Sequence, residues 1–285
     1  MFKKKFTLRQ MDSLTGYGFL AIWIIGFIAF TAYPFFYSIY LSFHEIRIGA
    51  RGIEAIWNGL GWYQHALFVD IEFIPAIINT FQFIIFSFPV IIVAALIIAV
   101  LLNGKFFARG FFRALFFFPV IIISGPVIAE LIDNDAANIG NMALSPLYIF
   151  VETLPGVIST PILYVLSNTV LILWFSGVQI LIYLAGLQKI GSPIYEAAAI
   201  DGASQWEIFW KIVLPFIRPL ILVNAIYTVV EIAAFPNNQI NQLIVSRMHT
   251  AAVIYSYSAA LSWMYFLIQA ALLAVVFFIL RPKGD

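Results

Sequence analysis

The sequence predicts an all-α integral membrane protein with six transmembrane helices and a cytoplasmic helix–turn–helix between the fourth and the fifth. Three observations support this fold class. The chain of 285 residues is 63% hydrophobic and only 10% charged, whereas about a quarter of the residues in soluble domains are charged. Its apolar runs are long and continuous, as in membrane-spanning helices, and do not alternate as they do in a β-barrel. A polar segment late in the chain has the signals of two short helices.

The apolar runs set the bounds of the predicted spans. A helix needs about 20 apolar residues to cross the hydrocarbon core of a bilayer, and long stretches of this chain contain almost no Asp, Glu, Lys or Arg. The six predicted helices cover residues 16–42, 77–102, 111–132, 162–188, 217–237 and 254–280. We therefore expect one transmembrane domain over residues 1–285, with outer loops at 44–76, 133–161 and 237–253.

The lysines and arginines predict the orientation, because cytoplasmic loops carry an excess of them. Twelve of the fifteen lie near the two ends of the chain or in the segments that follow the second and fourth helices. The other three are Arg47, Arg51 and Arg247. Both termini and segment 189–216 are therefore expected on the cytoplasmic side. A signal peptide is the alternative for the basic start of the chain, but its apolar run is too long for one.

The polar segment is predicted to open with a short helix. Ser192 and Pro193 are residue types that helices prefer at the N-cap and at the first position. Glu196 follows in the first turn, where the helix dipole favours an acid. Asp201 and Gly202 are expected to end the helix, because glycine readily adopts the left-handed conformation of the position after the C-cap.

A second helix is predicted to start at Ser204 and to end at Leu214 and Pro215. Ser204 and Glu207 have the spacing of a capping box. Four apolar residues at helical spacing would form one face: Trp206, Phe209, Trp210 and Val213. The residues alone leave two interpretations open, a hairpin at the membrane interface without a partner and a docking element for another protein.

This segment resembles the cytoplasmic EAA loop of ABC importer permeases, in which E-A-A is followed by D-G-A and by a hydrophobic helix that ends in L-P. The matching residues are Glu196, Ala197, Ala198, Asp201, Gly202, Ala203, Phe209, Ile212, Leu214 and Pro215. Other stretches resemble the binding-protein-dependent carbohydrate importers of this family, which have the type I importer fold: YPFFYSIYLSF, NTFQFIIFSFPVIIVAALIIAVLLN, FFRALFFFPVIIISGPVIAELI and YLAGLQKIGSPIYEAAAIDGA. The resemblance covers nearly the whole chain except the outer loop 133–161.

The resemblance implies a permease subunit in a prokaryotic cell membrane that forms half of the pathway for a sugar or oligosaccharide. The partners it implies are a second permease subunit, two cytoplasmic ATPase subunits that bind ATP and Mg, and an extracellular or periplasmic solute-binding protein. The second permease is similar or identical to this chain, and a heterodimer is the usual arrangement in this branch of the family. No cofactor, metal or nucleic acid is expected in this chain itself. The implied ATPase-coupling residues are Glu196, Ala197, Ala198, Asp201, Gly202 and Ala203, with Glu196 meeting a basic residue of the ATPase.

The later helices are expected to line the solute cavity. Glu231 is the one acid well inside an apolar span, where an ionisable group indicates a cavity by default. Alternatively, Glu231 lies at the outer mouth of the fifth helix, close to Asn237 and Asn238. Polar or amphipathic residues on the fourth and fifth helices indicate a lining suited to a hydroxylated solute: Trp174, Gln179, Asn224 and Tyr227. The resemblance places the solute near Trp174, Phe175, Thr228, Glu231 and Phe235, or else in the partner permease, because some permeases of this type leave solute binding to the partner subunit.

Two other classes of function fit the sequence less well. An ion- or proton-coupled secondary transporter usually has several intramembrane charges and often a repeated half, whereas Glu231 stands nearly alone here. A membrane enzyme would need acids, histidines or a nucleophile gathered at one depth, and His44, His65 and His249 do not have metal-ligand spacing. The chain has no G-x-x-x-x-G-K-[ST] phosphate loop, so ATP hydrolysis is expected in a separate subunit. It also has no cysteine.

Overall fold

The chain is mainly helical in the computed structural model, which describes residues 8–49, 52–104, 107, 109–122, 145–248 and 255–281. In this part of the chain, four helices are long and apolar enough to cross a membrane, and a fifth is added if one bent pair counts as a span. The predicted third span is described only as far as Ile122, and residues 133–144 of the loop 133–161 lie outside the described residues, as does His249. The chain divides into two units, 1–71 with 244–265 and 72–243 with 266–285.

The first unit begins with a long helix that includes the predicted first span. It consists of α1 (Leu8–Phe27), the π-helical segment η1 (Ile28–Ala32) and α2 (Tyr33–Ser42). At the π-helical segment, the Tyr33 amide donates to the Ile28 carbonyl. This wider turn lies immediately before Pro34, which has no amide hydrogen to donate. The helix therefore passes the proline without a break.

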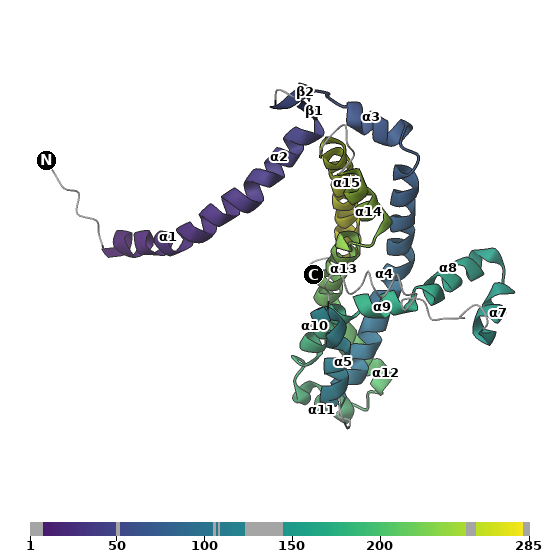
Figure 1. Cartoon of the computed structure of the whole chain (residues 1–285). Helices are drawn as coiled ribbons and strands as arrows, with labels where there is room; N and C mark the ends of the chain where they lie inside the picture. Colours follow the sequence, from purple (N-terminus) through teal and green to yellow (C-terminus); the bar gives the residue numbers. More distant parts are fainter. Residues whose placement is uncertain are drawn as a thin grey trace. The chain divides into compact units, whose positions relative to one another are not determined.

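A two-stranded hairpin in the first unit departs from the all-α prediction. Strands β1 (His44–Gly49) and β2 (Gly52–Trp57) form the hairpin (Figure 1). They pair antiparallel, with His44 opposite Trp57. Isoleucine alternates with polar residues in β1, which is the pattern of a strand with one covered face. The short helix α3 (Gly61–Phe68) follows the hairpin.

Hydrogen bonds connect this loop to the late part of the same unit. The Ile46 amide donates to Ser256 Oγ at 3.1 Å. Tyr257 Oη donates to Asp70 Oδ2 at 2.6 Å, and Arg247 Nη2 lies 3.5 Å from Asp70 Oδ1. Arg247 ends α14 (Gln239–Arg247), while Tyr257 lies in the first turn of α15 (Ser256–Leu280). The contacts thus join segments of the unit that are distant in sequence.

The second unit is built on α4 (Phe73–Asn103), which contains the predicted second span. Small residues one turn apart, Ala95 and Ala99, are fully buried and belong to the same core as Ile180 and Leu184 of α10 (Gly177–Leu187). Small side chains allow membrane helices to approach closely. The helix α5 (Arg109–Ile122) also packs here, where Arg113 Nη2 donates to the Leu102 carbonyl at 3.1 Å.

The predicted continuous fourth span, 162–188, is wrong, because the chain is broken into three helices there. These are α8 (Gly156–Ser167), α9 (Thr169–Phe175) and α10, and α8 and α9 meet at 65°. At the bend, Asn168 Nδ2 donates to the Tyr164 carbonyl at 2.8 Å, and Thr169 Oγ1 donates to the Leu166 carbonyl at 2.8 Å. Such side chains compete with the backbone for its own acceptors. The short helix α7 (Pro146–Glu152) precedes these three.

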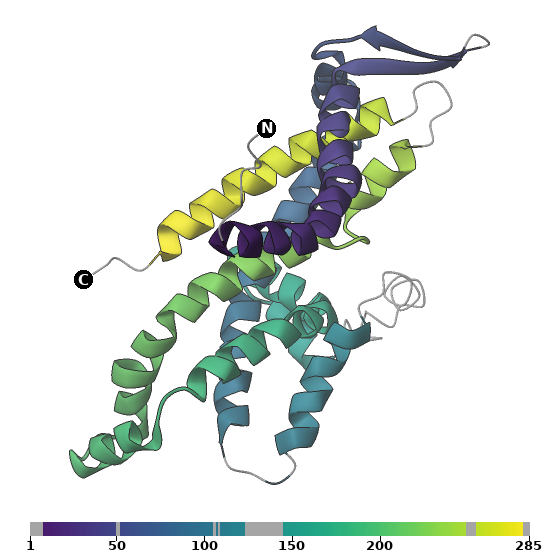
Figure 2. The same cartoon turned by 90° about the vertical axis from the view of Figure 1, so that its left-hand side faces the viewer.

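The predicted end of a helix at Leu214 and Pro215 is also wrong. The segments α12 (Gln205–Ile208), η3 (Phe209–Val213) and α13 (Leu214–Ala234) form one helix of 30 residues (Figure 2). The Leu214 amide donates to the Phe209 carbonyl across the π-helical segment. The wider turn again lies immediately before a proline, as it does before Pro34, so the missing amide of Pro215 does not end the helix.

Candidate functional site

The first half of the polar segment forms α11 (Ser192–Ile200). Its backbone turns helical one residue earlier than predicted, because Gly191 occupies the N-cap with an extended ψ of 147° and Ser192 is already helical. The prediction that Ser192 caps the helix is therefore wrong. Pro193 lies within the first two helical positions, where a missing amide hydrogen costs nothing.

The turn after α11 is a Schellman motif, and it contains the glycine that was predicted to be left-handed. Gly202 has a φ of +76°, in the left-handed region that glycine adopts without a steric penalty. Its amide donates to the Ala199 carbonyl at 3.1 Å, and the Ala203 amide donates to the Ala198 carbonyl at 2.9 Å. These two bonds satisfy carbonyl groups at the end of the helix. The predicted role of Gly202 in the backbone is confirmed.

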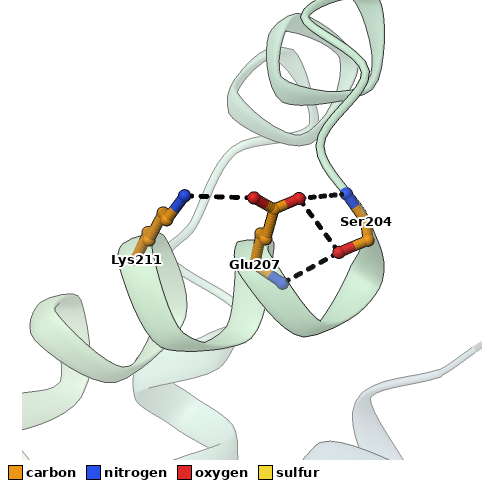
Figure 3. A network of polar contacts seen from close by, with 3 residues as sticks. All are labelled: Ser204, Glu207 and Lys211. Atoms are coloured by element: carbon orange, nitrogen blue, oxygen red, sulfur yellow. Dashed lines mark hydrogen bonds and ion pairs between the residues drawn. The ribbon is translucent and has the colours of Figure 1, made fainter.

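The capping box at the start of α12 is confirmed as well (Figure 3). Ser204 Oγ accepts the Glu207 amide at 3.3 Å, and Glu207 Oε2 accepts the Ser204 amide at 3.0 Å. Lys211 Nζ donates to Glu207 Oε1 at 3.1 Å. The Ser204 amide and then Lys211 stabilise the carboxylate, which lowers the pKa of Glu207 to about 2. The cap thus fixes where the second helix begins.

We call α11, α12 and the turn between them (192–208) the α11–α12 hairpin. Glu196, Ala197, Asp201 and Gly202 are exposed, whereas Ala198 is buried. The predicted apolar face is only partly covered: Val213 is buried, Phe209 is half-buried, and Trp206 and Trp210 are exposed. Since Ile200 and Trp206 are 86% and 70% exposed, the hairpin presents large apolar side chains beside its acids.

An open groove of about 540 Å³ lies beside the hairpin. Its walls come from the last turns of α4 and α10 and from the hairpin and η3: Val100, Asn103, Gly104, Leu187, Tyr195, Gln205, Trp206, Ile208, Phe209 and Val213. The exposed ring of Trp206 is part of this lining. The hairpin is therefore bordered by a partly apolar depression and not by a flat surface.

A buried polar network joins α10 to α13. Gln179 Nε2 donates to Thr228 Oγ1 and to Glu231 Oε2, both at 2.9 Å. Asn224 Nδ2 donates to the Gln179 carbonyl at 3.3 Å, and Thr228 Oγ1 donates to the Asn224 carbonyl at 2.8 Å. Gln179, Asn224 and Thr228 are fully buried. Two of the predicted solute residues, Thr228 and Glu231, thus take part in helix–helix bonds.

A cavity of about 220 Å³ in the second unit is lined mainly by amide and aromatic side chains; we call it the amide cavity. Its lining residues are Asn79, Thr80, Phe83, Tyr164, Asn168, Leu171, Ile232, Phe235, Asn237, Asn238 and Gln239. Of the five predicted solute residues, Phe235 lines it. The buried Phe175 ring lies behind the wall, with its centroid 5.2 Å from that of Phe235. Trp174 is half-buried and packs beside the same apolar cluster.

Hydrogen bonds hold some of the polar groups of the amide cavity in place. Asn79 Nδ2 donates to Gln239 Oε1 at 2.7 Å. Thr80 Oγ1 donates to Asn238 Oδ1 at 2.8 Å, and the Ile240 amide donates to the same oxygen at 3.0 Å. The sequence analysis missed Asn79 and Thr80 of α4, although amide and hydroxyl groups inside an apolar span were an available signal. In the described part of the chain, no group of acids and histidines is arranged to hold a metal ion.

No family model matches the chain, but curated relatives do. It is 30% identical over 226 residues to the probable ABC transporter permease protein YesP of Bacillus subtilis, covering 79% of this chain and 71% of that protein. It is 31% identical over 219 residues to MsmF of Streptococcus mutans, a multiple sugar-binding transport system permease protein, covering 75% and 73%. LacF of Rhizobium radiobacter, a lactose transport system permease protein, is 29% identical over 225 residues, covering 77% and 73%.

Solved structures share the fold. The chain matches a subunit of a bacterial ABC transporter involved in the import of the acidic polysaccharide alginate, with a TM-score of 0.65 and 21% identity. The match covers 96% of this chain and 98% of that subunit. A second structure, of a bacterial alginate ABC transporter in complex with a periplasmic protein that holds an alginate pentasaccharide, gives a TM-score of 0.58.

Proposed function

Because the chain belongs to the permease subunits of sugar ABC transporters, we propose that it forms half of a carbohydrate pathway and couples to a cytoplasmic ATPase through the α11–α12 hairpin. The family assignment makes it a multi-pass membrane protein and a permease, with ATP hydrolysis in a separate subunit. The observation that carries the proposal is the exposed, capped hairpin between two apolar helices, with Gly202 in the left-handed conformation.

The surface of the hairpin supports docking to another protein. Glu196 and Asp201 are exposed acids that flank the three alanines in the sequence, and a basic residue of the ATPase would pair with them. Ile200 and Trp206 are apolar and largely exposed. Burying such side chains against a partner lowers the free energy of the complex. The groove beside Trp206 provides a depression that a partner can enter.

The amide cavity is the solute site that we propose. Amide groups donate and accept hydrogen bonds at once, which suits the hydroxyl groups of a sugar, and the rings of Phe83, Tyr164 and Phe235 offer apolar faces. Small-molecule sites commonly combine an apolar lining with a few placed polar groups. The relatives named for lactose and for multiple sugars are consistent with a carbohydrate solute.

The proposed assembly contains this chain, a second permease, two ATPase subunits and a solute-binding protein. The alginate transporter structure in complex with its periplasmic protein supports the last of these. We propose six spans and cytoplasmic termini, in agreement with the basic residues near both ends. ATP-driven closure of the ATPase subunits would move the hairpin, and the pathway would alternate between two states that bind solute differently.

The test is uptake of radiolabelled sugars into vesicles that hold the co-expressed complex. Glu196→Ala should lower ATP-dependent uptake about tenfold or more and reduce the amount of ATPase that co-purifies, because a charge-assisted contact is lost. Glu152→Ala, which removes an exposed acid from α7, is the matched control and should change neither. Uptake that needs a proton gradient and no ATPase would overturn the proposal in favour of a secondary transporter.

A further inference from the structure

We propose that Gln179 is a positioning residue that makes α10 and α13 one rigid lever between the α11–α12 hairpin and the amide cavity. This inference rests on the proposed function, because a lever matters only if the hairpin is moved by an ATPase. We infer this role from the hydrogen bonds and burial of Gln179. The residue does not line the amide cavity, so it acts through other residues.

The lever begins with the chain connections of the hairpin. The residues after Leu187, the end of α10, lead directly into α11, and α12 continues through η3 into α13 without a break. Both helices that flank the hairpin are thus covalently connected to it. Any displacement of the hairpin is passed first to the near ends of α10 and α13. Whether the displacement reaches the far ends depends on how firmly the two helices hold each other.

Close apolar packing joins the two helices at the end near the hairpin. A Cβ atom at Gly186 would overlap Leu220 Cδ1 and touch Ile217 Cγ2, so a larger residue there would require the Leu220 side chain to shift. Ile217 is fully buried against the core that also contains Leu184 and Leu187. Small residues at membrane helix interfaces allow such close approach.

At the end near the amide cavity, hydrogen bonds join α10 to α13. Gln179 lies two turns before Gly186 on α10, and its amide bonds both Thr228 and Glu231 on α13. The next residue of α13 after Glu231 is Ile232, which lines the amide cavity, as does Phe235. The bonds of Gln179 are therefore made immediately beside the wall of the cavity.

At this position, hydrogen bonds fix the relative position of α10 and α13 more strictly than apolar packing does. The hydrophobic effect has no preferred direction, whereas a hydrogen bond weakens steeply when its length or angle changes. In surroundings of low dielectric, an unpaired carboxylate is costly, so the Gln179–Glu231 bond is expected to persist while the hairpin moves. The cavity wall would then follow the hairpin.

The experiment uses the complete complex, reconstituted with its ATPase subunits, partner permease and binding protein, and measures sugar transported per ATP hydrolysed. Gln179→Leu should lower this ratio about fivefold or more while ATP hydrolysis continues, because the hairpin still docks. Ser176→Ala is the matched control, since the buried Ser176 Oγ bonds the Ile172 carbonyl on its own side of the interface; its ratio should be unchanged.

Two further variants keep the test decisive if Gln179→Leu fails to assemble. Gln179→Asn keeps the amide but shortens it by one methylene group, and should lower the ratio less than leucine does. The double variant Gln179→Leu with Glu231→Leu removes the unpaired carboxylate, so it should assemble but remain uncoupled. Wild-type coupling in Gln179→Asn, or in the double variant, would overturn the inference.

A direct measurement of rigidity is possible because the chain contains no cysteine. Spin labels at Gln188→Cys and Ala234→Cys, both exposed positions, report the distance from the hairpin end of α10 to the cavity end of α13. The distance distribution should be narrow with Gln179 and should broaden in Gln179→Asn; equal widths would contradict the inference. If the unsubstituted complex shows no ATP-dependent uptake at all, the proposed function fails instead.

Discussion

The α11–α12 hairpin and the amide cavity lie in the same unit of the chain, but the sequence specifies them in opposite ways. The hairpin is built from contacts between near neighbours: Ser204 bonds Glu207, and Ala203 bonds Ala198. The cavity is built from contacts between distant segments, such as Asn79 with Gln239, which are 160 positions apart. One is a local structure that a short peptide pattern encodes, and the other exists only when several helices are packed together.

This difference separates the effects that substitutions should have. A change in the hairpin alters the shape that the ATPase would recognise, so it should act on the rate of ATP-driven transport. A change at the cavity removes a contact to the solute, so it should act on the solute concentration needed for half-maximal uptake. A hairpin substitution that changed only the half-maximal solute concentration, or a cavity substitution that changed only the rate, would contradict this assignment of roles.

The largest effect is expected from Gly202→Val. A β-branched residue with a φ of +76° is a strong steric outlier, and the left-handed conformation costs roughly 1–2 kcal/mol even for ordinary residues. The turn between α11 and α12 should therefore open, and uptake should fall more than tenfold at saturating solute. Initial uptake rates over a range of sugar concentrations measure this loss.

The control is Gly202→Asn, because asparagine tolerates the left-handed region better than other non-glycine residues. No side chain or backbone atom lies within 4 Å of where a Cβ would be at this position, so the asparagine fits and most of the uptake should remain. If both variants transported normally, the shape of the turn would be irrelevant to coupling.

An intermediate effect is expected from Asn237→Ala at the amide cavity. The loss of one hydrogen bond to a neutral hydroxyl group is worth about 0.5–1.5 kcal/mol, which corresponds to a roughly two- to tenfold rise in the half-saturating sugar concentration. The maximal rate should stay close to that of the unsubstituted complex. Concentration-dependent uptake separates the two parameters.

Asn241→Ala is the matched comparison for Asn237→Ala. Asn241 Nδ2 donates to the Ala233 and Phe235 carbonyls, both at 2.8 Å, and Asn241 does not line the amide cavity. Its loss should lower the yield of folded complex and leave the half-saturating concentration unchanged. A larger shift in that concentration for Asn241→Ala than for Asn237→Ala would remove the cavity from the solute pathway.

The fold was predictable where helices are long and apolar and less so where polar side chains act on the backbone. The bounds of α4 contain the predicted span 77–102, and the helix continues through Pro89, which lies inside it. The bend at Asn168 was missed because the side chain bonds the carbonyl of Tyr164 in the preceding turn, and the residue type alone does not show that this bond forms. The helix that continues past Pro215 depends on a π-helical turn, and no pattern in the sequence predicted this turn.

The hairpin was predicted in most of its detail because the capping box and the glycine turn are short-range patterns. The cavity was predicted only at Phe235. Asn79 lies on α4 and Asn168 at the bend between α8 and α9, and nothing in their own neighbourhoods shows that they meet. The partners of Glu231 were not foreseen either. Gln179 and Thr228 were noted as polar or as solute residues, but their mutual bonds require the packing of α10 on α13.

The smallest effect is expected from Ser204→Ala, which removes the cap of α12 without changing the turn. An N-cap serine contributes about 1 kcal/mol to its helix, but this helix continues for 30 residues and is anchored by the buried Ile208 and Val213. Only its first turn should fray, so amide hydrogen exchange should rise at the start of α12 while uptake falls no more than about twofold. Lys211→Ala, which removes an exposed ion pair to Glu207, should change even less. A loss of uptake in Ser204→Ala as large as that in Gly202→Val would mean that Ser204 is part of the docking surface, and the hairpin would no longer be explained by its backbone shape alone.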